Sequence, residues 1–229
     1  MRVMEKFKQF ISKIMVVMVA VLLSSCAKPL TKGEVETIHR VGIINHFPEY
    51  FTHMTVDITM LGDHGFRRVG DLTLKEFVGV ELKEQLQQKG FSVVEIKDVP
   101  FFDLLEQFLK HGLSMGKGRK EVSIENVDLV IEIIPTPAEL MANSIGYGFH
   151  KSTIFGGEGR QLAYTSLDLK FMVNGENRCN SCNNESSIEV SGMQLNWEEL
   201  EEPKQIALKG ILKLNIREAL RAALEKSNL

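Results

Sequence analysis

Two hydrophobic patterns alternate along the chain, one typical of strands and the other of helices. Apolar runs, or a strict alternation of apolar and polar residues, predict strands at 39–45, 55–60, 91–96, 127–134, 167–173 and 187–195. In one of them Leu167, Leu169 and Phe171 share a side, while Asp168 and Lys170 take the other. This strand is therefore expected to be buried on one face and exposed on the other.

Apolar residues at helical spacing predict three helices. The most regular can be capped by Asp71 or Thr73 and is followed by Gly90, a residue type that often ends a helix. A short helix is expected after Pro100, and a long final helix opens at Pro203.

The order of these elements predicts the fold class. Helices join the early strands, and a hairpin follows late in the chain. This order favours a single α/β (α+β) domain, residues 36–229, with a mixed β-sheet and helices packed on it. Roughly 200 residues are enough to bury one core.

The first 25 residues form a distinct segment. A basic start leads into an apolar run from Ile14 to Leu23, which ends in Leu23-Ser24-Ser25-Cys26. Such a run is shorter than the ~20 residues that span a bilayer and fits the ~7–15 of a secretory signal. The four residues resemble the lipobox of bacterial lipoproteins. An ordinary signal sequence with a chance cysteine, or an amino-terminal amphipathic helix, is the alternative.

The lipobox resemblance implies a complete arrangement for the amino-terminal part. Residues 1–25 would be a signal peptide, Cys26 the acylated first residue, and residues 26–35 a polar tether. The acyl chains would hold the protein to a membrane at about 0.8 kcal/mol per buried methylene. By resemblance to enterobacterial sorting, Ala27 points to the outer membrane, with the domain facing the periplasm.

Charge argues against nucleic acid as a partner. The whole chain has a net charge of −3, and removing the leader's four basic residues and one acidic residue leaves about −6. Nucleic-acid binding depends on a clustered basic face.

Cys179 and Cys182 are spaced C-x-x-C in a polar, turn-forming stretch. Half a zinc site or a redox motif is one interpretation, but zinc takes four ligands and a redox pair opens a helix after a strand. A structural disulfide fits better, and on the loop-entropy model a loop this small gains about 2 kcal/mol.

Four segments resemble a loose group of bacterial envelope proteins that includes the curli-secretion lipoprotein and the amino-terminal domain of TolB. The segments are 40–44, 82–91, 127–131 and the glycine-aromatic stretch 146–149. The resemblance implies a role in envelope secretion, assembly or structure without enzymatic activity. The long membrane-spanning hairpins of the curli channel are not evident, which argues against pore formation.

No pattern points to a catalytic, cofactor or metal site. The basic stretch 114–120 lacks the spacing of a phosphate-binding loop, and there is no G-x-S-x-G. His46 and His53 would need nearby carboxylates, such as Glu49 or Asp57, to bind zinc. We therefore expect no enzyme, no cofactor and no metal.

The glycine-aromatic region 141–160 is the candidate partner loop, through Tyr147, Phe149 and Phe155. Alternatively, these aromatics pack on the domain's own core. The leading hypothesis is a membrane-anchored, non-enzymatic binding or assembly module that contacts another envelope protein or itself. The alternatives are an envelope hydrolase and a small-ligand or lipid carrier.

Overall fold

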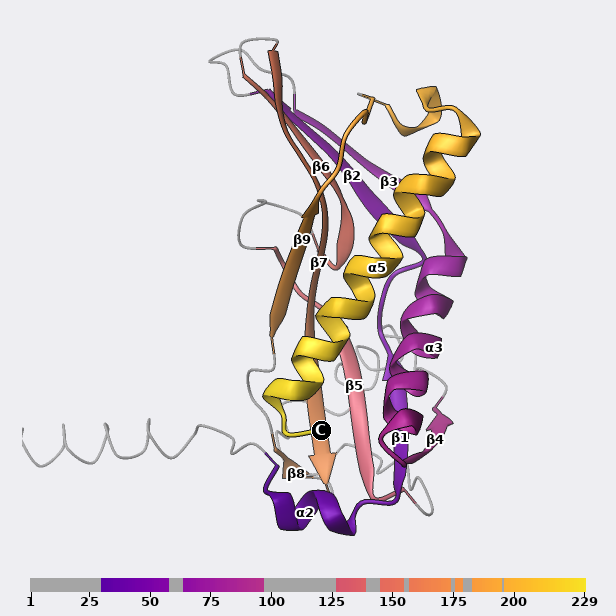
Figure 1. Cartoon of the computed structure of the whole chain (residues 1–229), viewed down its shortest axis with the longest axis vertical. Coiled ribbons are helices and arrows are strands. Elements are labelled where there is room, and N and C mark those ends of the chain that lie inside the picture. The colour runs from indigo at the N-terminus through magenta and orange to yellow at the C-terminus, as the bar shows by residue number, and fades with distance from the viewer. Residues whose placement is uncertain are drawn as a thin grey trace, which may run out of the picture.

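The computed structural model describes residues 30–57, 64–96, 127–138, 145–154, 157–173, 176–178, 183–194 and 196–229. Within these ranges a nine-stranded mixed sheet is covered by helices (Figure 1). This confirms the predicted single α/β domain with a mixed sheet. None of the helices in the described ranges is long and apolar enough to cross a membrane.

The sheet combines parallel and antiparallel pairs. Its main path runs β3 (His64–Gly70), β2 (Tyr50–Asp57), β6 (Tyr147–Ile154), β7 (Gly157–Val173), β5 (Leu129–Pro135), β1 (Arg40–Asn45) and β4 (Ser92–Glu95), and β8 (Glu176–Asn177) and β9 (Asn184–Glu189) pair with β7. The pairs β1–β4, β1–β5 and β2–β6 are parallel, and the others are antiparallel.

The 17-residue strand β7 joins two half-sheets. Its residues Leu162 to Thr165 pair with both β6 and β9, so these two strands flank β7 on opposite edges. Leu167 pairs with both β9 and β5, so β5 lies on the same edge as β6. One edge of β7 therefore carries β6, β2 and β3 along its first half and β5, β1 and β4 along its second (Figure 1).

Two long, parallel helices cover one face of this sheet (Figure 1). Helix α3 (Leu72–Gln88) begins at Asp71, whose carboxylate accepts the Thr73 N–H at 3.0 Å, and Gly90 follows it at φ +93°. Helix α5 (Glu202–Lys226) has Pro203 in its first turn. A short helix α2 (Lys32–Thr37) lies at one end of the domain, and a 3₁₀ turn η1 (Trp197–Glu199) precedes α5.

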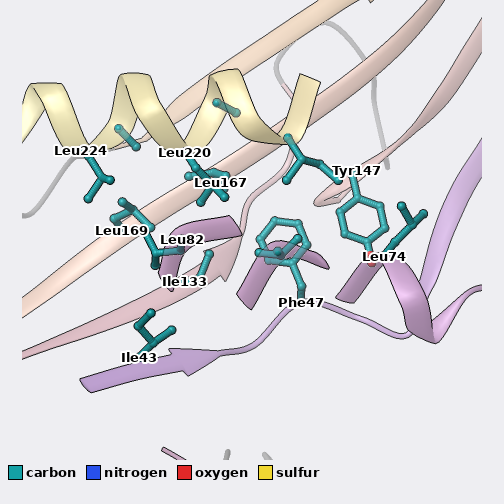
Figure 2. Packing of buried hydrophobic residues seen from close by; sticks show 14 of the residues in the cluster. Ile43, Phe47, Leu74, Leu82, Ile133, Tyr147, Leu167, Leu169, Leu220 and Leu224 are labelled. Carbon is teal, nitrogen blue, oxygen red and sulfur yellow. The ribbon is translucent and has the colours of Figure 1, made fainter. Parts of the chain in front are cut away.

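The core lies between this face and the helices (Figure 2). Alternate strand residues such as Ile43, Ile133 and Leu169 meet Leu82 of α3 and Leu220 of α5, and all five are at most 2% exposed. Each side chain of this size contributes about 1.5–3 kcal/mol on burial.

An aromatic pair fills the core where the two half-sheets meet. The chain leaves β1 at Asn45 and enters β2 at Tyr50, and Phe47 between them stacks on Tyr147 at 5.0 Å between ring centroids. The Tyr147 hydroxyl donates to the Pro48 carbonyl at 2.9 Å. Phe47 and Tyr147 are 1% exposed, so they fix the turn between the half-sheets from inside.

Several sequence expectations are corrected by these elements. The 55–60 strand begins earlier, at Tyr50, and its residues 58–60 are outside the described ranges. Strand β3 was not among the predicted strands. The candidate partner loop, expected over 141–160, contains β6 and the start of β7, which begins at 157, not 167. The short helix expected after Pro100 is also outside the described ranges.

The predicted tether is too long. Leu30 is 1% exposed, and the chain from Lys32 onward forms α2. The domain therefore includes at least residues 30–35, which were assigned to a polar tether, because the apolar Leu30 side chain is part of the core.

Candidate functional site

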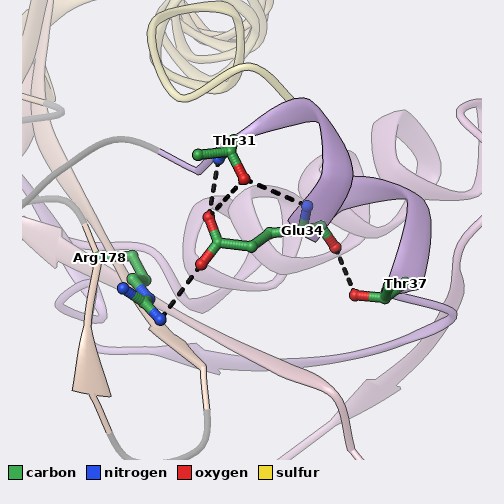
Figure 3. Close-up of polar contacts among 4 residues, drawn as sticks. All are labelled: Thr31, Glu34, Thr37 and Arg178. Atoms are coloured by element: carbon green, nitrogen blue, oxygen red, sulfur yellow. Dashed lines mark hydrogen bonds and ion pairs between the residues drawn. The ribbon is translucent and has the colours of Figure 1, made fainter.

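The end of the domain that receives the amino-terminal segment is closed by a hydrogen-bonded cap (Figure 3). The Glu34 carboxylate accepts the Thr31 N–H and hydroxyl, both at 2.9 Å, while the Thr31 hydroxyl accepts the Glu34 N–H at 3.3 Å. The other Glu34 oxygen pairs with Arg178 at 3.1 Å. The Thr31 backbone bond, followed by its hydroxyl, holds the pKa of Glu34 below its usual range. This capping box satisfies two backbone N–H groups at the start of α2.

The carboxyl terminus holds the same entry point from the other side. Asn228, at φ +67°, donates its side-chain amide to the Leu30 carbonyl at 2.8 Å. Leu229 is 6% exposed and belongs to the same core cluster as Leu30. The first described residue is therefore clamped by the hydrogen bond from Asn228.

The segment with the two cysteines starts and ends near this clamp. Arg178 pairs with Glu34, and the Lys226 ammonium donates to the Asn183 carbonyl at 2.9 Å. Cys179 and Cys182 themselves, like Cys26, lie outside the described residues. The predicted disulfide and the lipidation site therefore remain predictions.

The candidate partner loop is corrected for two of its three residues. Tyr147 is 1% exposed and Phe149 is fully buried, where it stacks on Trp197 at 5.3 Å. Burial raises the pKa of Tyr147 above its ordinary range, an effect to which Asp71 adds. Both rings point to the helix-covered face, so they form core, as the alternative interpretation held. Phe155 is outside the described residues.

A buried histidine lies beside this aromatic cluster. His53 of β2 is 1% exposed, and its ring lies 6.1 Å from Trp197. Burial lowers its pKa to about 4, against the opposing effect of Glu198, while Arg67 and Lys151 lower it further. From the sequence, His53 was expected at the surface or, with His46, as a metal ligand, whereas the structure buries it. Among the described residues, no three His, Cys, Asp or Glu side chains gather in a way that could hold a metal ion.

Two buried carboxylates connect α3 to α5. Asp71 pairs with Lys209 at 2.7 Å, and Glu81 pairs with Arg217 at 2.9 Å. Burial would raise the pKa of both carboxyls, but hydrogen bonds from Lys209 and Thr73 to Asp71 outweigh burial and lower its pKa. The bonds from Arg217 and Gln85 do the same for Glu81. These ion pairs belong to the helix packing.

Comparison with known proteins gives only a faint structural likeness. No family model matches the chain, and no curated protein does. A crystal structure of protein XCC0632 from Xanthomonas campestris, of family DUF330, is similar with a TM-score of 0.37 and 7% identity, over 90% of this chain and 93% of that one. A TM-score this low carries no argument about the function of this chain.

Proposed function

We propose that this chain is a lipid-anchored protein of the bacterial envelope that acts as a non-enzymatic binding or assembly module. The observation that carries the proposal is the lipobox-like sequence that ends at Cys26, and Leu30, only four residues further on, is already buried in the domain. Four extended residues span at most about 14 Å. An acylated Cys26 would therefore keep the α2 end of the domain close to the membrane surface.

The shape of the domain supports a role in which the end opposite α2 is presented to a partner protein. Helix α2 lies at one end of the long axis, and β2, β3 and the start of β7 extend to the other (Figure 1). The clamp of Leu30 by Asn228 limits rotation at the entry point. In a domain anchored at α2, the half-sheet of β6, β2 and β3 lies away from the bilayer, where another envelope protein can reach it.

The roles of its acidic residues favour binding over catalysis. Among the described residues, four carboxyls have lowered pKa values: Glu34, Asp71, Glu81 and Asp128. Each holds parts of the fold together, as when Asp128 accepts the backbone N–H groups of His39 and Arg40 at 2.8 Å. The oxygens of these carboxylates already accept hydrogen bonds or form ion pairs that hold the fold together, so these four groups are poor candidates for catalysis.

Metabolic labelling with palmitate tests the anchor. We expect the full-length protein to be labelled in a bacterial host and to sediment with membranes, and Cys26→Ser to abolish both. Cys179→Ser and Cys182→Ser are matched controls that should keep the label, because they leave the lipobox intact. Labelling that survives in Cys26→Ser would overturn the proposed anchor.

Chemical cross-linking of intact membranes tests the binding role. We expect the protein in a discrete species heavier than its monomer, whose polypeptide is 25.8 kDa before the proposed signal peptide is removed. If the chain remains monomeric at all cross-linker concentrations, the proposed binding or assembly role is wrong, even if palmitate labelling is retained.

A further inference from the structure

The outer edge of β3 is free of any partner strand among the described residues. β3 ends the order of the sheet, and its only pairing there is with β2. The register is continuous from the Tyr50–Gly70 pair to the Val56–His64 pair, without a bulge. β3 contains no proline. Bulges and prolines are common devices that protect an edge strand against further pairing.

The phase of the ladder shows which backbone groups point outward. Asp71 N–H donates to the Glu49 carbonyl at 2.9 Å, in the same register as the β2–β3 pairs. Hydrogen-bonded pairs recur at every second residue of an antiparallel ladder. The N–H and C=O groups of Phe66, Arg68 and Gly70 therefore face away from β2, along the open edge.

The side chains give this edge a positive charge. Arg68 is exposed and lies over the rings of Tyr50 and Phe66, at 5.0 and 5.9 Å, while Phe66 is 43% exposed. Arg67, on the opposite face of the strand, pairs with Glu198 at 3.2 Å, and its side chain is 53% exposed. The strand itself has no acidic residue.

We propose that the β3 edge binds an extended, acidic segment of a partner protein, which adds to the sheet as a further strand. This deepens the proposed binding role and rests on it. Main-chain hydrogen bonds to Phe66, Arg68 and Gly70 would supply affinity, and acidic side chains beside Arg67 and Arg68 would supply selectivity.

Charge disfavours a second copy of this chain as the occupant. In an antiparallel pairing of β3 with itself, Arg67 and Arg68 would lie near the same residues of the other copy. Like charges on neighbouring strands are destabilising. An acidic strand would instead place its carboxylates beside Arg68 on one face and beside the Arg67–Glu198 pair on the other.

Peptide binding tests the proposal on the full-length protein in detergent. The probes are two end-blocked, fluorescent octapeptides, one alternating glutamate with valine and the other alternating lysine with valine. By fluorescence anisotropy we expect the glutamate peptide to bind at least tenfold more tightly. Arg68→Glu should weaken the glutamate peptide and strengthen the lysine peptide.

A pair of substitutions at one position separates backbone pairing from side-chain contact. Phe66→Pro removes an outward N–H without breaking the β2 ladder and should weaken the glutamate peptide at least tenfold. Phe66→Thr keeps the N–H and should stay within threefold of the original protein. An unchanged circular dichroism melting curve shows that each variant remains folded.

Amide hydrogen exchange gives a second readout. Binding of the glutamate peptide should slow exchange at Phe66, Arg68 and Gly70, while Arg67 and Val69 exchange slowly from the start. Equal affinity for the two peptides, or full binding by a folded Phe66→Pro variant, would overturn the proposal. So would a dimer, detected by ultracentrifugation, that Phe66→Pro abolishes. Palmitate labelling of the same preparation tests the anchor independently.

Discussion

Arg217 places two guanidinium nitrogens, Nε and Nη2, on the Oε2 atom of Glu81, at 3.0 and 2.9 Å. The other carboxylate oxygen accepts the Gln85 amide at 3.0 Å. The Glu81 side chain is 5% exposed and that of Arg217 is 48% exposed. A carboxylate inside the helix interface is thus neutralised by a cation at its surface.

Arg217→Met should lower the free energy of unfolding by about 2 kcal/mol, measured by urea denaturation. This value lies between the ~1 kcal/mol or less of an exposed ion pair and the ~3–5 kcal/mol of a fully buried one. The reason is that Glu81 would remain buried with its charge no longer compensated. Arg221→Met is the control on the same helix, because Arg221 and its partner Glu218 are both more than half exposed. A change of similar size in both variants would argue against a special role for the Glu81 pair.

His53 should make the fold less stable as the pH falls from about 6.5 to about 4. Its pKa in the fold is about 4, whereas an unfolded histidine has a pKa near 6.5, so the unfolded chain takes up the proton first. The largest effect from this group is about 3 kcal/mol, reached near pH 4. His53→Gln should reduce the slope of unfolding free energy against pH in this window. An identical slope in the variant would show that His53 is not the titrating group.

Tyr147→Ser should destabilise the domain by about 3–5 kcal/mol, as removal of a large aromatic from a core does. Tyr147→Phe should cost only about 1 kcal/mol, because it removes the hydrogen bond to Pro48 and keeps the stack on Phe47. Differential scanning calorimetry can rank the two variants against Phe66→Ser, a matched change at an exposed aromatic. A Tyr147→Ser variant as stable as the original would contradict the assignment of this ring to the core.

Asn228→Gly should loosen the amino-terminal clamp while leaving the rest of the domain folded. Glycine accepts the positive φ of this position but cannot donate to the Leu30 carbonyl. Loss of about 1 kcal/mol at this site should speed amide exchange at Val35 and Ile38 roughly fivefold. The amides of α3 serve as the internal control. Unchanged exchange in α2 would mean that this hydrogen bond does not hold the entry point.

The elements that could be predicted from the sequence are those whose pattern is local. Asp71 and Gly90 mark the two ends of α3, and Leu167, Leu169 and Phe171 reveal the buried side of β7 without reference to any distant residue. Capping and alternation act over a few positions. These local signals therefore remain valid in any tertiary arrangement of the rest of the chain.

The glycine-rich strands were missed because their glycines suggest loops. A Cβ at Gly148 would lie 2.1 Å from the Thr52 carbonyl oxygen, and one at Gly159 would lie 2.2 Å from that of Ser152. Glycine at these positions permits close backbone approach inside a sheet, and the register shifts between Lys151 and Thr153. The need for glycine arises from a neighbouring strand, which sequence alone does not place.

The site around His53 was missed for a similar reason. His53 lies on β2 and Trp197 precedes α5, so nothing in the local sequence pairs them. The chain has a single tryptophan, and that rarity was the one available signal. The charge of the β3 edge was also visible as Arg67-Arg68, but its meaning depends on the strand being last in the sheet.

The position of α5 has a consequence for biosynthesis. This 25-residue helix follows every described strand of the sheet in the sequence, and its buried side chains close the core over both half-sheets. Until α5 has been synthesised, β7 lacks the cover of this helix on its apolar face, so stable folding of the core has to wait for α5. Such a delay suits a chain threaded through a membrane in an unfolded state, as its proposed signal peptide requires.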